Sequence, residues 1–470
     1  MVERRIRGLD GSDRTIGAGT LRDLAEGLDG GILTPEDAAY DEARAVWNGM
    51  IDRHPALIVR CASADDVQEA VRFARDRGME VAVRGAGHHI AGNSVCEGGF
   101  LIDLSPMKTV QVDPRARTAR AGAGATLSDL DGATQTHGLA TPLGVNSTTG
   151  IAGLTLGGGF GWLSRMHGLT VDNLAAAEVI TADGERLRAS EDENPDLFWA
   201  LRGGSGNFGV VTSFEYRLHD VGPEVLSGLI VHPFDDAREV LDRYREFADD
   251  APDRVNPWFV LRKAPPLPFL PEDVHGRMIL ILPVFVAGDM ESAKPLVEPL
   301  RAIGKPIADV VGPHPYTGWQ QAFDPLLTPG ARNYWKSHNF PALVDGALDA
   351  IVDYAGRLPS DQTEIFVARM GGAMNRKPAD ATAYPHRDVE YLMNVHARWE
   401  DPGEDDGCVG WAREFFDTMA RYATGGVYVN FMPTDETDRV KAAYGPNYAR
   451  LAGLKRRYDP DNFFHLNQNI

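Results

Sequence analysis

The stretch VRGAGHHIAGNSVCEGGFLIDLS, from Val83 to Ser105, decides the fold because it sets a histidine in a glycine-rich turn between two strand-like runs. The run that ends at Val83 is β-branched, and strand character resumes over residues 100–104. Three glycines of the turn permit positive φ angles, namely Gly85, Gly87 and Gly92. The sequence thus predicts a loop lined with backbone N–H groups that could hold a pyrophosphate, with Arg84 at its mouth. A turn whose histidines form only local hydrogen bonds is the alternative.

This loop resembles the flavin-attachment segment of the vanillyl-alcohol-oxidase-type flavoproteins, in particular their berberine-bridge-enzyme-like branch. In that family an Arg-Gly/Ser-Gly/Ala-Gly-His motif wraps the FAD diphosphate. The last residue of the motif bonds through a ring nitrogen to the 8α-methyl carbon of the isoalloxazine. The resemblance implies FAD as the cofactor and an 8α-histidyl bond at His88, with His89 as the next residue along.

A second glycine-rich segment, GVNSTTGIAGLTLGGGFGWLSRMHGLTVDNL, runs from Gly144 to Leu174 and is too dense in glycine for a regular strand or helix. We expect something flat or polyanionic against this backbone, although glycines that let two elements pack closely would give the same pattern. Members of the family carry a similar segment along the flavin, followed by Gly-Leu-x-x-Asp-Asn. The matching residues here are Gly168, Leu169, Asp172 and Asn173.

Two positions in this segment bear on the chemistry of the cofactor. Many family members have a cysteine that forms a second bond to flavin carbon 6, and Asn146 stands at that position. The resemblance therefore implies monocovalent FAD, attached through His88 alone. Members that react poorly with oxygen tend to carry a bulky aliphatic residue three positions further on. Thr149 stands there, which favours O2 as the electron acceptor.

The segment GGSGNFG, residues 203–209, contains a literal GxGxxG, but we reject a Rossmann dinucleotide site. Such a turn must follow a strand and open a helix, so that the helix N-terminus faces the pyrophosphate. Here the helix-like DLFWALRG comes before the glycines and the strand-like VVTSFEY comes after them. The order of elements is reversed.

The end of the chain extends the resemblance through YVNFMP at 428–433, AAYGPNYARL at 442–451 and KRRYDPDNFFHLNQNI at 455–470. The family's closing segment is similar and returns to the flavin domain. The likeness covers about 50–218 and 425–470, and the middle only loosely through AYPHR at 383–387. It implies these cofactor-binding residues: Arg84, Gly85, Ala86, Gly87, His88, His89, Gly92, Asn93, Ser94, Gly144, Asn146, Thr149, Gly150, Gly153, Leu154, Gly159, Gly161, Gly209, Val210, Val211, Asn430 and Asn467.

The catalytic base is less well defined. Several family members end a Tyr-x-Asn-Tyr motif in tyrosine, but Phe431 stands there and cannot accept a proton. Tyr428 is a candidate if a nearby cation or the flavin lowers its pKa, and a buried hydrogen-bonding role is its alternative. On the strand expected at 391–399, alternation puts Asn394 and His396 on one face, so either could line the substrate cavity. A structural role is the alternative for the histidine.

The pattern along the chain predicts an α+β fold, with a two-lobed FAD-binding domain and a substrate domain built on an antiparallel sheet flanked by helices. A βαβ unit opens the first domain, and Ser63 is expected to cap its helix. Strands are expected at 56–60, 80–83, 109–112, 118–121, 177–180, 210–216, 225–232, 277–286, 363–370 and 391–399. Helices are expected at 21–28, 63–77, 127–136, 197–202, 237–247 and 343–358.

The tail from 427 to 470 is expected to hold a strand and a helix at 435–444. The expected divisions are an N-terminal extension (1–50), the FAD-binding domain (51–220), the substrate-binding domain (221–424) and a C-terminal segment that returns to the FAD domain (425–470).

Composition excludes several classes of partner. The 470 residues carry a formal net charge of −20 with no basic run, so neither nucleic acid nor an anionic membrane is expected. No apolar run is long enough to span a membrane, and the N-terminus lacks the apolar core of a secretory signal, which predicts a cytoplasmic protein. Three scattered cysteines give no disulfide framework, and no HxH, HExxH or CxxC motif supports a metal site.

These features predict an FAD-dependent oxidase that oxidises a CH–OH donor, a sugar, an oligosaccharide or a secondary-metabolite alcohol, with O2 to give H2O2. Its partners would be a small-molecule substrate and O2, and the protein would be a monomer or homodimer. The alternatives are a CH–NH donor, a dehydrogenase that passes electrons to a carrier, and a flavin-binding protein without turnover. An open aromatic groove would suit an oligosaccharide, and a closed apolar one a polyketide, alkaloid or amine. The sequence leaves this choice open.

Overall fold

A four-stranded sheet holds the first glycine-rich loop in the computed structural model, which describes residues 2–470. In spatial order its strands are β3 (Gly31–Leu33), β4 (Leu57–Arg60), β6 (Phe100–Asp103) and β5 (Val81–Arg84). Since β4 and β5 both run parallel to β6, the chain must cross over between them, and α3 (Ala64–Asp76) makes this crossover. The predicted βαβ unit is confirmed. The Ser63 hydroxyl accepts the Asp66 N–H as the predicted helix cap.

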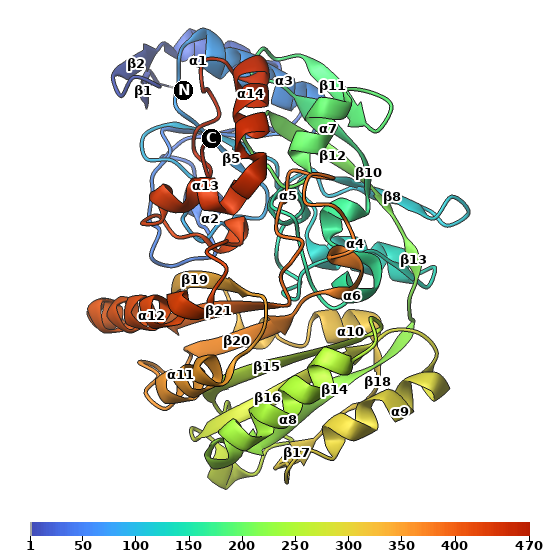
Figure 1. Ribbon diagram of the computed structural model, residues 1–470. Coiled ribbons are helices and arrows are strands. Elements are labelled where there is room, and N and C mark those ends of the chain that lie inside the picture. The colour runs from blue at the N-terminus through green and yellow to red at the C-terminus, as the bar shows by residue number, and fades with distance from the viewer. Residues whose placement is uncertain (1) are drawn as a thin grey trace.

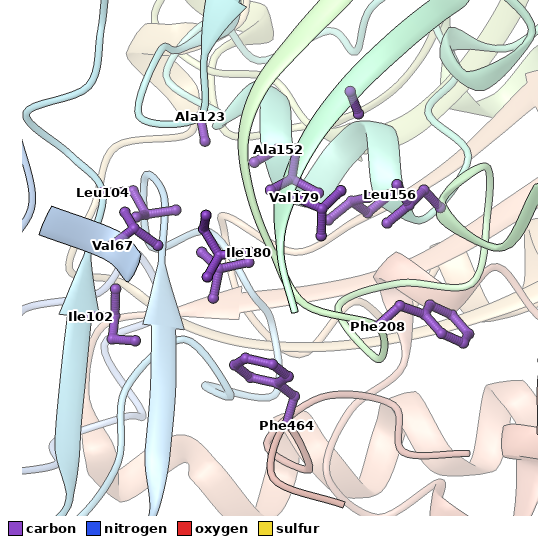
Figure 2. Close-up of a cluster of buried hydrophobic side chains, with 14 of the residues drawn as sticks. Val67, Ile102, Leu104, Ala123, Ala152, Leu156, Val179, Ile180, Phe208 and Phe464 are labelled. Carbon is purple, nitrogen blue, oxygen red and sulfur yellow. The ribbon is translucent and has the colours of Figure 1, made fainter. Parts of the chain in front are cut away.

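A five-stranded antiparallel sheet packs on the same helix α3. Its strands in spatial order are β11 (Arg186–Ser190), β10 (Leu174–Ile180), β12 (Val210–Arg217), β8 (Thr118–Gly122) and β7 (Val110–Asp113). The shared core brings Val67 of α3 close to Ile102 of β6 and Ile180 of β10 (Figure 2). Phe464, near the end of the chain, lies in the same cluster, so the tail forms part of the core of this upper lobe.

The lower lobe in Figure 1 is built on an eight-stranded antiparallel sheet. Seven of its strands lie in the order β17 (Ala308–Asp309), β14 (Glu224–Pro233), β16 (Met278–Val286), β15 (Val255–Lys263), β20 (Glu364–Arg369), β21 (Tyr391–Trp399) and β19 (Arg332–Phe340), and β18 (Gly312–Pro315) pairs with β14. Apolar residues that alternate along the strands, such as Leu280 and Leu282, are buried under helices on one face. Those helices are α8 (Ala237–Asp250), α9 (Met290–Arg301), α11 (Asp345–Ala355) and α12 (Asp405–Met419).

The predicted α+β fold class is therefore confirmed, including the antiparallel sheet with helices on one face. The remaining elements are β1 (Arg4–Arg7), β2 (Asp13–Ile16), α1 (Ala18–Glu26), α2 (Tyr40–Arg44), α4 (Leu127–Gln135), β9 (Leu139–Ala140), α5 (Ile151–Leu156), α6 (Ser164–His167), α7 (Pro195–Leu201), β13 (His219–Asp220), α10 (Tyr316–Gln320), α13 (Val440–Tyr444) and α14 (Tyr448–Tyr458). Helix α7 ends just before the GGSGNFG segment and β12 begins just after it, which confirms the rejection of a Rossmann turn.

The strand expected in the tail is wrong. Residues 429–431 form a 3-10 turn instead, and the part of the tail that the structure describes contains no strand. The Asn430 amide donates to the Leu154 carbonyl, so side-chain contacts, rather than a β ladder, hold this segment against the upper lobe. The helix expected at 435–444 shortens to α13, and α14 follows it without having been predicted.

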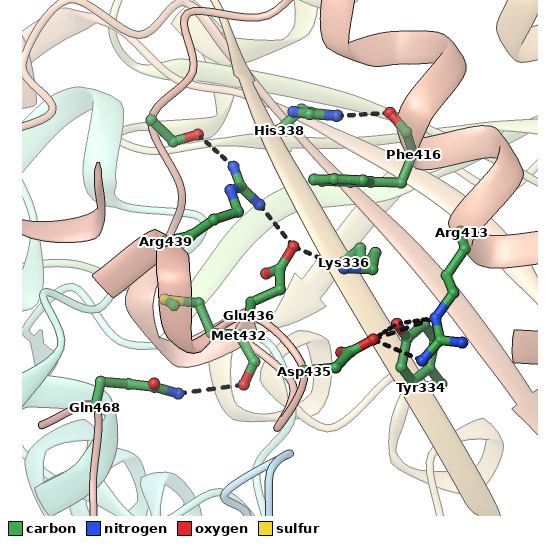
Figure 3. Close-up of polar contacts among 11 residues, drawn as sticks. Tyr334, Lys336, His338, Arg413, Phe416, Met432, Asp435, Glu436, Arg439 and Gln468 are labelled. Carbon is green, nitrogen blue, oxygen red and sulfur yellow. Dashed lines mark hydrogen bonds and ion pairs between the residues drawn. The ribbon is translucent and has the colours of Figure 1, made fainter. Parts of the chain in front are cut away.

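Ion pairs tie the same tail to the lower lobe (Figure 3). The Lys336 ammonium of β19 lies 2.8 Å from the Glu436 carboxylate, and both side chains are buried. Near the end of the chain, the Gln468 amide donates to the Met432 carbonyl at 3.3 Å. The tail thus passes between the lobes and is held from both sides, while both termini lie in the upper lobe (Figure 1).

Candidate active site

A cavity of about 720 Å³ lies between the two lobes. Its walls come from the loop after β5, the segment around α5, the start of β12, the tail, and the face of the large sheet that the four helices leave free. Most of the predicted cofactor residues line it: Gly85, Ala86, Gly87, His88, His89, Asn93, Ser94, Gly144, Asn146, Thr149, Gly150, Gly153, Leu154, Gly209, Val210, Val211, Asn430 and Asn467. Residues far apart in the sequence therefore meet at one site, as the sequence predicts.

Four predicted cofactor residues stand behind the cavity wall. A Cβ on Gly92 would lie 2.7 Å from the Ile51 side chain, and Gly159 and Gly161 similarly lie against neighbouring chain. Arg84 was expected at the mouth of the loop but lies under it, where a Cβ on Gly87 would be 3.4 Å from its Nε. These positions shape the wall rather than form its surface.

Only part of the expected turn geometry occurs in the first loop. Gly87 and Gly92 have φ angles of 75° and 71°, as predicted, whereas Gly85 keeps an ordinary negative φ. Gly85 serves a close approach instead, because an added Cβ would lie 3.2 Å from the Ala123 carbonyl oxygen.

The loop after β5 has the hydrogen-bonding groups that a diphosphate needs. Within the described residues 2–470, none of the backbone N–H groups from Gly85 to His89 donates to a protein acceptor. Buried side-chain atoms nearby are also unpaired, namely Arg84 Nε and Nη1, His89 Nδ1, Ser94 Oγ and Asn467 Oδ1. Unpaired buried polar groups are costly unless a ligand satisfies them, so this wall fits an anionic, hydrogen-bonding cofactor such as FAD.

Hydrogen bonds fix the tautomer of His88. Asn146 Oδ1 accepts both the backbone N–H of Thr148, at 3.1 Å, and the hydroxyl of Thr148, at 2.7 Å. Because that hydroxyl donates to Asn146, it accepts from His88 Nε2 at 3.0 Å. The proton of the neutral imidazole is therefore on Nε2, and the lone pair is on Nδ1.

Two further contacts complete the surroundings of His88. Burial lowers the pKa of His88 to about 4, so the imidazole is neutral near pH 7. The Trp47 ring stacks on it with centroids 5.3 Å apart, and the Trp47 indole N–H donates to the Leu327 carbonyl of the lower lobe. The Thr149 hydroxyl lies 3.5 Å from Nδ1, and His88 is thus held as a neutral nucleophile whose lone pair on Nδ1 has only this long contact.

The sheet face opposite provides the other wall. Alternation along β21 does direct Asn394 and His396 into the cavity, as predicted. Trp335 of β19 lies beside His396, with ring centroids 4.8 Å apart, and also contacts Phe431. Aromatic residues of the lower lobe that line the cavity include Trp258, Trp319, Phe323, Trp335 and Phe366, and Phe160, Trp162 and Phe431 from the upper lobe and the tail pack against them.

Glu364 and Arg262 are cavity residues that sequence reasoning missed. The Glu364 carboxylate accepts from Arg262 Nη1 at 2.7 Å and lies 3.1 Å from His396 Nδ1. Burial opposes ionisation of Glu364, but the charge of Arg262 and the contact with His396 outweigh it and lower the pKa of that carboxyl to about 2. Residue 364 lies on an alternating strand, so its face was predictable, but its partner is 102 residues away in the sequence.

Glu364 and His396 share one proton site. Asn333 donates its amide N–H to the Ala331 carbonyl at 2.7 Å, so Asn333 Oδ1 is free to accept from His396 Nε2 at 3.2 Å. The other ring nitrogen of His396 then faces Glu364. Burial lowers the pKa of His396, and the carboxylate opposes this effect. The pair can take up a proton at His396 Nδ1 while the ionised Glu364 balances the charge.

Tyr428 lacks the cation that the sequence interpretation requires. Its hydroxyl oxygen accepts the Gly159 N–H at 3.2 Å and the Asn430 amide at 3.0 Å. Burial is the largest influence, and it raises the pKa of Tyr428 to about 12 despite these two donors. Tyr428 is therefore a phenol at neutral pH, with its own proton available for a hydrogen bond.

Two other kinds of site are absent from the described residues 2–470. No cluster of three or more His, Cys, Asp or Glu side chains could hold a metal ion. None of the helices is both long and apolar enough to cross a bilayer.

Comparison with known proteins agrees with this geometry. The family model of the FAD binding domain matches residues 55–190, and the model described as berberine and berberine like matches residues 427–470. An FAD-linked oxidoreductase of Bacillus subtilis strain 168, YgaK, is 32% identical over 94% of this chain and 97% of its own length. (R)-6-hydroxynicotine oxidase of Paenarthrobacter nicotinovorans is 31% identical over 94% and 97%.

Solved structures give the same result. 6-Hydroxy-D-nicotine oxidase from Arthrobacter nicotinovorans superposes with a TM-score of 0.83 at 29% identity, over 94% of this chain and 98% of that one. Xylooligosaccharide oxidase from Myceliophthora thermophila C1, solved with xylobiose, has a TM-score of 0.83 at 24% identity over 96% and 98%, and shows the fold alone. Fold and cavity thus define an FAD-dependent oxidoreductase. The chain belongs to the berberine-bridge-enzyme-like branch of the vanillyl-alcohol-oxidase-type flavoproteins.

Proposed function

We propose that this protein is an oxidase that carries FAD on His88 alone and oxidises a CH–OH donor with O2, giving a carbonyl compound and H2O2. The observation that carries the proposal is the single cavity that joins His88 to the Glu364–His396 pair. Asn146 in place of a cysteine supports attachment at one point, and Thr149 supports access of O2. The neutral His88 ring with its lone pair on Nδ1 is the form that can bond to carbon.

Each part of the chain has a role in this proposal. Residues 51–220 bind FAD, 221–424 bind the substrate, 425–470 return to close the FAD site, and 1–50 form an N-terminal extension. The diphosphate would be held by the N–H groups of the loop after β5, with the positive charge of Arg84 beneath that loop. We place the protein in the cytoplasm as a monomer or homodimer.

Oxidation of an alcohol removes a hydride from carbon and a proton from oxygen. FAD, when bound, supplies the hydride acceptor. The Glu364–His396 pair, which lines the cavity, takes the hydroxyl proton, and this proton comes to lie between His396 Nδ1 and the Glu364 carboxylate that balances its charge. Tyr428 donates a hydrogen bond to the donor oxygen and, with Asn394, orients it.

The charges of the cavity favour an alcohol over an amine. Among the cavity residues in the described part of the chain, Glu364 is the one carboxylate, and it already contacts Arg262 and His396. An amine is mostly protonated at neutral pH, and a buried ammonium needs a carboxylate that is free to contact it. A neutral CH–OH donor requires no such partner.

The test uses purified holoprotein. We expect a yellow acid precipitate with a mass excess of one FAD, since a covalent flavin survives denaturation. Under anaerobic conditions, neutral alcohols should bleach the flavin faster than amines of the same carbon skeleton, and admission of air should restore the colour with release of H2O2. Slow reoxidation in air would indicate a dehydrogenase, and a flavin that no donor reduces would indicate a binding protein without turnover. Either result overturns the proposal.

A further inference from the structure

We infer that the donor is an alcohol whose carbinol carbon is joined to an aromatic or polycyclic hydrocarbon body, and that oligosaccharides are excluded. The inference rests on the proposed function, since it concerns the substrate of the same cavity. It is carried by the distribution of polar and apolar side chains over the sheet face, and by the two segments that cover that face.

Polarity changes across the sheet from one edge to the other. The strand registers pair Arg262 with Glu364, and Glu364 with His396, so the polar groups lie together over β15, β20 and β21. The adjacent part of the wall, over β14, β16 and the rest of β15, is apolar. Its cavity-lining residues are Leu229, Trp258, Val260, Ile281 and Pro283. A donor that reacts beside Glu364 must therefore lay its remaining bulk on an apolar surface.

The proline-rich connector between β15 and β16 covers this apolar part. Leu267 and Phe269 of the connector line the cavity and pack with Val260, Ile281 and their neighbours in one hydrophobic cluster. Backbone hydrogen bonds, such as Ala264 N–H to the Arg277 carbonyl at 2.8 Å, hold the connector closed at its base. It is thus an ordered wall.

A second segment, from 310 to 327, closes the other side. Its cavity-lining residues are Val310, His314, Pro315, Gly318, Trp319, Ala322, Phe323, Pro325, Leu326 and Leu327. The polar side-chain groups among them are His314, whose Nδ1 already contacts Ser227 of β14, and the unpaired indole N–H of Trp319. The segment is fastened to the upper lobe, since the backbone N–H of Ser147 donates to Asp324 at 2.9 Å.

These walls suit a hydrocarbon and not a sugar. Sugar rings can stack on aromatic side chains, but their hydroxyls need hydrogen-bonding partners around the ring edge. Between the proline-rich connector and the segment 310–327, each sugar hydroxyl left without a hydrogen-bonding partner would weaken binding by about tenfold or more. A hydrocarbon body instead gains affinity from every part of its surface that leaves water.

Binding of an inert probe separates this inference from the oxidase proposal. 2-Acetonaphthone is the ketone of a naphthyl alcohol, and its carbonyl carbon has no hydrogen to give up as hydride. Its affinity for the oxidised holoprotein therefore does not depend on turnover. Isothermal titration calorimetry at several temperatures should give saturable binding with a negative heat capacity change, which marks burial of apolar surface. Xylobiose in the same cell should bind at least tenfold more weakly. Comparable or tighter binding of xylobiose, or no binding of the ketone, overturns the inference.

Substitutions in the connector test where the probe binds. Leu267→Asn puts an amide on the cavity wall and should weaken binding of 2-acetonaphthone by about tenfold. Pro268→Ser, at the exposed neighbouring position, is the matched control and should bind as the wild type does. If Leu267→Asn lowers the melting temperature too far for the binding measurement, Phe269→Ser provides the same test. Wild-type affinity in both cavity variants overturns the inference, whereas a variant series that behaves as expected supports it even if no alcohol is turned over.

Discussion

Replacement of Glu364 by glutamine tests the buried ion pair and the proton acceptor together. The carboxylate contacts Arg262 at 2.7 Å and His396 at 3.1 Å, with about a tenth of its side chain exposed. A fall of the Glu364 pKa from 4.5 to about 2 corresponds to about 3 kcal/mol of stability, at 1.36 kcal/mol per pKa unit. Breaking a buried pair from one side costs a similar amount, about 3–5 kcal/mol.

The sign of the effect with pH follows from the lowered pKa. Glu364 stabilises the folded state above pH 4.5, and this contribution is lost as the pH falls toward about 2. At pH 7, Glu364→Gln should lower the melting temperature of the holoprotein by about 3–5 °C, because the entropy of unfolding of a 470-residue chain is about 1 kcal/mol/K. The difference from wild type should shrink as the pH falls below 4.5. Glu298→Gln is the control, because Glu298 pairs with Arg301 on the surface and should melt as the wild type does.

The kinetic arm measures the proposed proton transfer. Stopped-flow reduction of the flavin by an alcohol should slow about 100-fold to 10,000-fold in Glu364→Gln, the usual range for removal of a general base. Since burial holds the pKa of His396 below 6.5, the wild-type rate should stay constant down to that pH and fall only below it. Flavin reduction at the wild-type rate in the variant would refute the role of the pair, and an unchanged melting temperature would refute the buried charge.

Three other outcomes are expected. His88→Ala should release FAD into the supernatant on acid precipitation, and covalent flavin in this variant would disprove the attachment site. Thr148→Val should lower the covalently bound fraction in freshly purified protein, because the Nε2 proton of His88 loses its acceptor. Asp172→Asn should lower the free energy of unfolding by about 3–5 kcal/mol, since it leaves the buried Arg387 guanidinium without its partner at 2.8 Å, and a urea midpoint equal to that of wild type would contradict this. Burial raises the pKa of Asp131 from 3.8 to about 7, so folding should weaken by about 4 kcal/mol as the pH rises through that range, and Asp131→Asn should remove this slope from a series of melting curves.

Local patterns predict the helices and strands well where apolar residues follow a regular spacing. The apolar spacing of α3 and its Ser63 cap, and the alternation of β21, correspond closely to the structure. Helix α9 escapes such reasoning because Pro295 and Pro299 lie inside it, and an internal proline is normally taken as a helix breaker. Strand β15 similarly contains Pro257, and polar residues interrupt β19.

The site is predicted less completely than the fold. The glycine-rich loops are recognisable in the sequence because their composition is unusual, and His88 stands within one of them. Glu364 belongs to an ordinary alternating strand, and only the sheet register places it beside Arg262 and His396. The segment YVNFMP shows the opposite error, because its composition is typical of a strand but the structure has a turn there. The Asn430 amide donates to the Leu154 carbonyl and to the Tyr428 hydroxyl, and these contacts hold the turn. Contacts between distant segments decide both cases.

The position of Phe464 and Asn467 in the flavin lobe sets an order of events during synthesis. Both residues line the cavity, and Phe464 also belongs to the core cluster that contains Val67 and Ile180 (Figure 2). Residues 464 and 467 are synthesised after every strand of the lower lobe. The wall of the cofactor site is therefore completed only after the substrate domain has been made, and a shorter nascent chain meets free flavin with that wall unfinished.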